Sequence, residues 1–100
     1  MDVVLDGKTM VLKVKTKLVA VNIKNMIEFT KSVLDEADDY EDIIIDLSAS
    51  ENIDSMGITF LIGLYKTGDN KGKKVMLRGV SPAMLNLFKI MRLEEIFEIV

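Results

Sequence analysis

A run of apolar, mostly β-branched residues at Ile43–Leu47 limits the folds open to this chain more than any other feature. Only Asp46 interrupts it. Such runs predict a central strand that is covered on both faces. A polar connection over residues 48–52 follows, and the pattern then becomes helical. One apolar stripe is formed at spacings i, i+3, i+4 and i+7 by Ile58, Leu61, Ile62 and Tyr65.

The junction between this strand and this helix carries a single hydroxyl. Ser55 falls in or next to the first helical turn, after Asp54 and before Met56 and Gly57. Backbone N–H groups there lack partners and the macrodipole is positive, so an anion such as a phosphate on Ser55 is favoured by about 0.3–1 kcal/mol. Asp and Ser are also the commonest N-cap residues, so either Asp54 or Ser55 could do no more than cap the helix.

Length and composition indicate one soluble globular domain over residues 1–100. One hundred residues suffice for a single core, and 49% hydrophobic with 29% charged residues lies outside the disordered range. The chain has no cysteine, which rules out disulfides and suits a cytoplasmic protein. No signal peptide is expected, and no apolar run approaches the roughly 20 residues that cross a bilayer.

The absence of histidine excludes several chemistries. Ser-His-Asp and Cys-His catalysis and ordinary zinc sites cannot be built from this chain. A net charge of −3 gives no basic footprint for nucleic acid, and the lysines at 71, 73 and 74 are expected to form a solvated strand edge. The acidic run over 35–42 lacks EF-hand spacing and is expected to be a solvated connection, with no metal and no cofactor.

The N-terminal third predicts a hairpin and a helix. Residues 3–5 and 9–15 flank Asp6-Gly7, which suits a type I′ turn, with Met10, Leu12 and Val14 on the buried face. Helical periodicity then runs over about 21–37. Its inward residues are predicted to be Ile23, Met26, Ile27, Thr30, Val33, Leu34 and Ala37.

The later elements are marked by turn and cap residues. The helix that follows Ser55 is expected to stop near Lys66 or Thr67, before a strand over 74–80 that Gly79 closes. Ser81-Pro82 is a strong helix start, and a last strand is expected at 97–100. Inward residues of that helix are predicted to be Leu85, Phe88 and Met91, with Met84 and Leu87 at the margin.

The resulting order, β-β-α-β-α-β-α-β, predicts an α/β fold with a mixed, mostly parallel sheet. In this order and in its motifs the chain resembles the STAS domain, and within it the bacterial anti-sigma factor antagonists. The resemblance covers the last sixty residues in detail. It is carried by the strand 43–47, the segment Ile53–Ile58, the helix through Leu61, Gly63, Tyr65 and Lys66, the Lys71-Gly72 turn, and Val80-Ser81-Pro82-Ala83 with Leu87-Phe88 and Leu93.

The resemblance implies partner switching, with the chain as substrate and ligand rather than enzyme. Ser55 would be phosphorylated by an anti-sigma factor that is also a serine kinase, and a PP2C-type phosphatase would reset it. The unphosphorylated form would bind that anti-sigma factor and release the sigma factor, acting as a monomer or weak dimer in the cytoplasm. The implied partner surface comprises Asp54, Ser55, Met56 and Gly57, together with Asn22 in the loop over 17–22.

Two other functions stay open on the sequence alone. A STAS protein can belong to another assembly, such as a stressosome-like complex or a transporter, in which Ser55 is never phosphorylated. A small enzyme or nucleotide-binding module is the third possibility. For that function the sequence offers neither a P-loop nor a Rossmann glycine fingerprint, and Ser55 has no evident base to activate it.

Overall fold

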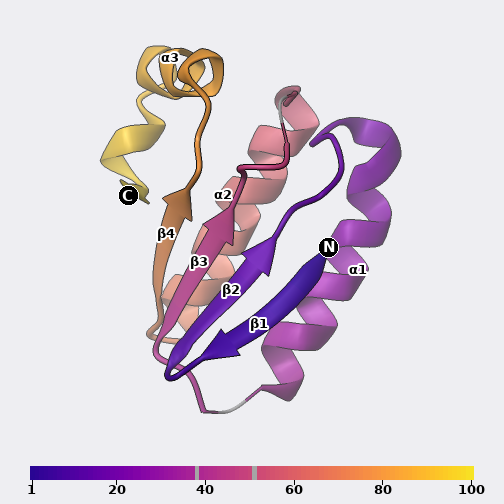
Figure 1. Ribbon diagram of the computed structural model, residues 1–100, viewed down its shortest axis with the longest axis vertical. Helices are drawn as coiled ribbons and strands as arrows, with labels where there is room; N and C mark the ends of the chain where they lie inside the picture. Colours follow the sequence, from indigo (N-terminus) through magenta and orange to yellow (C-terminus); the bar gives the residue numbers. More distant parts are fainter. Residues whose placement is uncertain (38, 51) are drawn as a thin grey trace.

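A five-stranded sheet forms the centre of the computed structural model, which describes residues 1–37, 39–50 and 52–100 (Figure 1). The strands lie side by side in chain order, with β1 antiparallel to β2 and every later neighbour parallel. This confirms the predicted mixed, mostly parallel sheet. The strands are β1 (Asp2–Asp6), β2 (Thr9–Lys13), β3 (Asp42–Asp46), β4 (Lys74–Arg78) and β5 (Glu98–Ile99).

The helices fall between the strands as predicted. They are α1 (Ala20–Glu36), α2 (Ser55–Asn70) and α3 (Pro82–Ile90), followed by the 3₁₀ turn η1 (Leu93–Glu95). Across the described ranges, the helices are all too short or too polar to cross a membrane. Residues Asp38 and Glu51, which belong to the predicted acidic and polar connections, lie outside the described residues.

The two long helices, α1 and α2, lie on the same side of the sheet (Figure 1). Ile43 and Ile45 point toward them and are 1% and 0% exposed, whereas Ile44 is only half-buried. The expectation that this strand is covered on both faces was therefore wrong. Side chains alternate between the two faces of a strand, and the helices bury one of those faces.

The hairpin forms one residue later than predicted. Asp6 pairs with Thr9, so the loop residues are Gly7 and Lys8 rather than Asp6 and Gly7. Gly7 has a φ of 61°, and Lys8 does not have a positive φ. A type I′ turn needs positive φ at both positions, so this single positive φ at the first position fits type II′ instead. The predicted buried face is confirmed, because Met10 and Leu12 in β2 and Val14 just after it are all buried.

The inward face of α1 is narrower than predicted. Ile27 was expected in the core but is 46% exposed, because it faces α2 along the side of the helix pair instead of pointing at the sheet. Val33 and Ala37 are partly buried against the core. The prediction is confirmed at the four buried positions Ile23, Met26, Thr30 and Leu34.

Helix α2 continues to Asn70, beyond the predicted end near Lys66 or Thr67. The turn-forming residues there were misleading, because Gly68 serves close packing inside the helix. A Cβ on Gly68 would lie 2.5 Å from a methyl carbon of Val75 in β4. The chain turns instead at Gly72, which has a φ of 72°.

Helix α3 begins as predicted, with the Ser81 hydroxyl accepting a hydrogen bond from the Met84 backbone N–H at 3.2 Å. Phe88 is fully buried, and Met84, expected only at the margin, is also buried. Leu85 is half-buried. The prediction for Met91 was wrong, because the helix ends at Ile90 and leaves Met91 46% exposed.

The lysine-rich turn before β4 is engaged with neighbouring groups. Lys71 pairs with Asp35 at 3.3 Å, and Lys74 pairs with Glu98 at 2.7 Å. The Lys73 ammonium lies 4.5 Å from the centre of the buried Tyr40 ring. β4 lies between β3 and β5, so the predicted strand edge is not formed, and the charges of these lysines are instead balanced by local contacts.

Candidate functional site

Asp54 is the residue that caps α2, which leaves Ser55 as the first helical residue. The backbone of Asp54 is extended, and its Oδ1 accepts a hydrogen bond from the Gly57 backbone N–H at 2.9 Å. This contact satisfies one of the unpaired donors at the start of the helix. Of the two capping assignments that the sequence left open, the structure selects Asp54, so the Ser55 side chain is not needed as the cap.

The same carboxylate also reaches the start of α1. Asp54 Oδ2 accepts a hydrogen bond from the Ala20 backbone N–H at 3.0 Å, while Val19, the N-cap of α1, makes no side-chain cap. One side chain therefore serves the positive ends of two helices. Hydrogen bonds from Gly57 and then from Ala20 hold the pKa of the Asp54 carboxyl below its ordinary value.

Backbone contacts hold the two helix starts together. The Leu18 backbone N–H donates to the Asn52 carbonyl at 2.9 Å, and the Asp54 N–H donates to the Leu18 carbonyl at 3.0 Å. Gly57 packs against this crossing, since a Cβ there would lie only 2.1 Å from the Leu18 carbonyl oxygen. Gly57 is buried, and the physical reason for a glycine at this position is the close approach of the two segments.

The Ser55 side chain is exposed beside this junction. Its hydroxyl makes no hydrogen bond to any described residue, and both oxygens of the neighbouring Asp54 carboxylate are occupied by backbone donors. Met56 is 47% exposed, and Val21 on α1 is 83% exposed. Ser55 is therefore open to solvent, next in the chain to an exposed methionine, and can be reached by another protein.

Asn22 lies on the first turn of α1, two residues after Ala20, and its own hydrogen bonds go to the loop before α1 rather than to Asp54, Ser55, Met56 or Gly57. Its side-chain amide donates to the Lys17 carbonyl at 2.9 Å, and its backbone N–H donates to the Val19 carbonyl at 2.9 Å. Asn22 thus ties down the loop that precedes α1.

Residue types alone did not predict the contribution of Leu18 and Ala20 to this junction. The Ala20–Asp54 hydrogen bond joins residues 34 positions apart, and it uses a backbone group that every non-proline residue carries. The loops that follow β2 and β3 lie at the same edge of the sheet because these two strands are parallel neighbours. Among the residues that the structure describes, no cluster of three acidic side chains suited to a metal ion is present.

The whole chain, residues 1–100, matches the family model of the STAS domain. The protein therefore belongs to the STAS domain family, as the resemblance in its motifs predicted. A search of curated proteins finds no match.

Solved structures with the same fold come from more than one functional setting. A candidate anti-sigma factor antagonist from Thermotoga maritima is 22% identical, with 98% of this chain and 83% of that chain covered and a TM-score of 0.83. The anti-sigma factor antagonist SpoIIAA in its unphosphorylated form is 14% identical, with 99% and 86% covered and a TM-score of 0.80. A sulfate transporter family protein from Wolinella succinogenes is 17% identical, with 92% and 73% covered and a TM-score of 0.75.

Proposed function

We propose that this protein is an anti-sigma factor antagonist that works by partner switching at Ser55. In this proposal the unphosphorylated form binds a cytoplasmic anti-sigma factor that is also a serine kinase, and so frees a sigma factor for transcription. Phosphorylation of Ser55 ends that complex, and a PP2C-type phosphatase restores it. The observation that carries the proposal is the exposed Ser55 hydroxyl at the junction of two helix N-termini.

The fold can accept a phosphate at this position. Phosphorylation adds about −1.5 to −2 charges and three acceptor oxygens. Those charges would lie in the first turn of α2, where the positive end of the helix dipole favours an anion even though the Gly57 and Ala20 N–H groups already bind Asp54. Ser55 points away from the core, so no buried contact has to be broken. The phosphorylated protein should therefore keep its structure.

The complex with a partner would respond differently. A partner that packs on Ser55 and Met56 would have to remove water from a phosphate that lies next to the Asp54 carboxylate. A loss of about 3 kcal/mol weakens binding more than a hundredfold. A local change of charge is thus sufficient to operate the switch without a large conformational change.

The test is phosphate mapping on the intact protein. The purified protein is incubated with ATP and the candidate anti-sigma kinase of its host, and its mass is followed for the gain of about 80 Da that one phosphate adds. We expect one adduct, mapped by fragmentation to Ser55. It should be absent from Ser55→Ala and present in Ser32→Ala, a control that removes another exposed serine. An adduct elsewhere, or none with an active kinase, would contradict the proposal.

A second candidate is a regulatory STAS domain of a transporter, in which Ser55 is not phosphorylated. The likeness to the sulfate transporter family protein supports considering this function. It predicts that the Ser55 surface binds a partner whether or not ATP and kinase are present. Retained partner binding by Ser55→Asp would favour it over the switch.

A further inference from the structure

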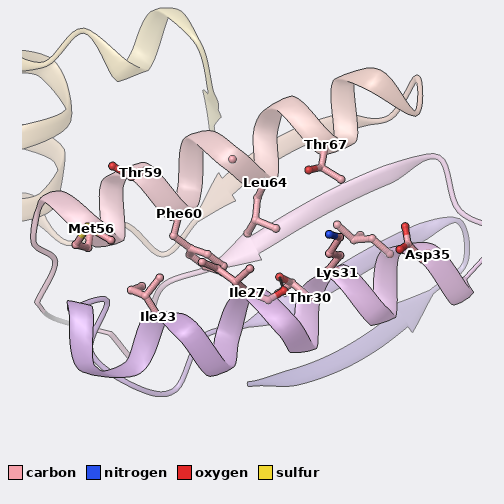
Figure 2. A pocket seen from close by; sticks show the side chains of 12 residues that line it. Ile23, Ile27, Thr30, Lys31, Asp35, Met56, Thr59, Phe60, Leu64 and Thr67 are labelled. Carbon is pink, nitrogen blue, oxygen red and sulfur yellow. Dashed lines mark hydrogen bonds between the residues drawn. The ribbon is translucent and has the colours of Figure 1, made fainter.

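A groove of about 340 Å³ lies between α1 and α2, and its walls are mostly apolar. Figure 2 shows Ile23 and Ile27 on α1 pointing across to Phe60 and Leu64 on α2, with Met56 at one end. Ile27 is 46% exposed and Met56 is 47% exposed, so this apolar surface faces solvent. The volume is at the lower end of the range for small-molecule sites, which are typically lined by apolar side chains with a few polar groups.

Gly63 keeps this groove open. It lies in the middle of α2, where glycine is unfavourable relative to alanine. Close packing explains the other two glycines of the helix, because a Cβ would lie 2.1 Å from the Leu18 carbonyl oxygen at Gly57 and 2.5 Å from Val75 at Gly68. A Cβ on Gly63 would meet no atom within 4 Å. Internal packing therefore gives no reason for the glycine at 63.

One end of the groove carries a cation. The Lys31 side chain extends over the groove between Leu64 and Thr67, as Figure 2 shows. Within the described part of the chain Lys31 has no ion-pair partner, whereas the nearby Asp35 carboxylate is paired with Lys71 at 3.3 Å. The groove thus offers an apolar channel with an ammonium group available to an anion at one end, beside the Asp35 carboxylate that Lys71 already engages.

We propose that this groove binds a medium-chain alkyl carboxylate. Its carboxylate would pair with Lys31, and its tail would lie along Ile27, Phe60 and Ile23 toward Met56. From Leu64 back to Met56 the helix rises about 12 Å, which is close to the length of an extended chain of about ten carbons. Ser55 does not line the groove, although Met56 belongs to both surfaces, so decanoate binding to the protein without kinase or partner tests this site separately from the phosphorylation switch.

The probe for this site is decanoate, titrated into the ¹⁵N-labelled protein and followed by amide chemical shifts and calorimetry. We expect saturable shifts at residues of the groove, Gly63 among them. Affinity should rise with tail length from hexanoate to decanoate, by up to about fourfold per methylene that becomes fully buried. Decyltrimethylammonium, which has the same tail and a cationic head, should bind more weakly.

Two variants test the two halves of the site. Gly63→Leu, whose side chain enters open space, should fold, as checked by circular dichroism, and should weaken decanoate binding more than tenfold. Lys31→Met should weaken decanoate binding and remove the preference for decanoate over decyltrimethylammonium. Lys66→Met removes an exposed lysine of α2 that does not line the groove, and should bind as wild type does.

Three results would overturn the proposal. The first is no saturable binding of decanoate, and the second is equal binding by wild type and a folded Gly63→Leu. The third is a head-group preference that Lys31→Met leaves unchanged. If decanoate does not bind but Gly63→Leu weakens binding of the host anti-sigma factor, the groove belongs to a protein interface and the alkyl carboxylate assignment is wrong.

Discussion

Replacement of Gly57 by alanine tests the close approach on which the Ser55 site depends. The new Cβ would lie 2.1 Å from the Leu18 carbonyl oxygen and 2.8 Å from an Ile53 side-chain carbon, so the two segments must separate. The oxygen belongs to the backbone and cannot rotate away, and overpacking of this kind costs about 1–3 kcal/mol. A better helix propensity offsets up to about 1 kcal/mol of that. The net loss of stability should be about 1–2 kcal/mol.

The matched control is Gly63→Ala in the same helix. Its Cβ meets no atom within 4 Å, so only the helix propensity changes and the protein should gain about 0.5–1 kcal/mol. Urea unfolding followed by far-ultraviolet circular dichroism measures both variants. In thermal scans Gly57→Ala should melt about 4–16 °C below wild type, and Gly63→Ala a few degrees above it. If Gly57→Ala is as stable as Gly63→Ala, the argument from the Leu18 contact is refuted.

The remaining predictions concern charge and packing. Ser55→Ala should bind the anti-sigma factor as wild type does but resist phosphorylation, and Ser55→Asp should fold normally and bind at least about tenfold more weakly in calorimetry. Burial raises the pKa of Asp46, but hydrogen bonds from Ser48 and Arg78 outweigh it and leave that pKa below its ordinary value. The ionised Asp46 carboxylate therefore stabilises the fold above about pH 4, and this contribution is lost as the pH falls below that value. In Asp46→Asn the free energy of unfolding should depend less on pH in the acidic range. Phe88→Ala, which empties a fully buried position, should lower the free energy of unfolding by about 3–5 kcal/mol in urea titrations.

Local patterns predicted the elements because each has a local physical cause. The β-branched run at 43–47 forms β3, and Ser81-Pro82 starts α3 through the cap to Met84. The predictions from sequence were wrong where contacts between distant residues determine where an element ends or which side chain is buried. The turn-forming residues predict a helix end before Gly68, yet the missing side chain of Gly68 lets α2 pack against Val75.

The candidate site was predictable only in part, for the same reason. The sequence placed Ser55 at a helix start, and the structure puts its side chain in solvent there. The start of α1 is also part of the site, because the Ala20 N–H donates to the Asp54 carboxylate. The sequence could not predict this contact, since it uses a backbone group and not a particular side chain. Likewise, the role of Ile27 was misjudged because periodicity identifies an apolar face without saying which neighbour covers it.

The central claim is that a phosphate on Ser55 decides whether the protein binds its partner. The most direct measurement is calorimetric titration of the host anti-sigma factor with the unphosphorylated protein and with protein phosphorylated only at Ser55. We predict tight binding of the first and binding more than about a hundredfold weaker for the second, with matching circular dichroism spectra. Equal affinity of the two folded forms would contradict the account.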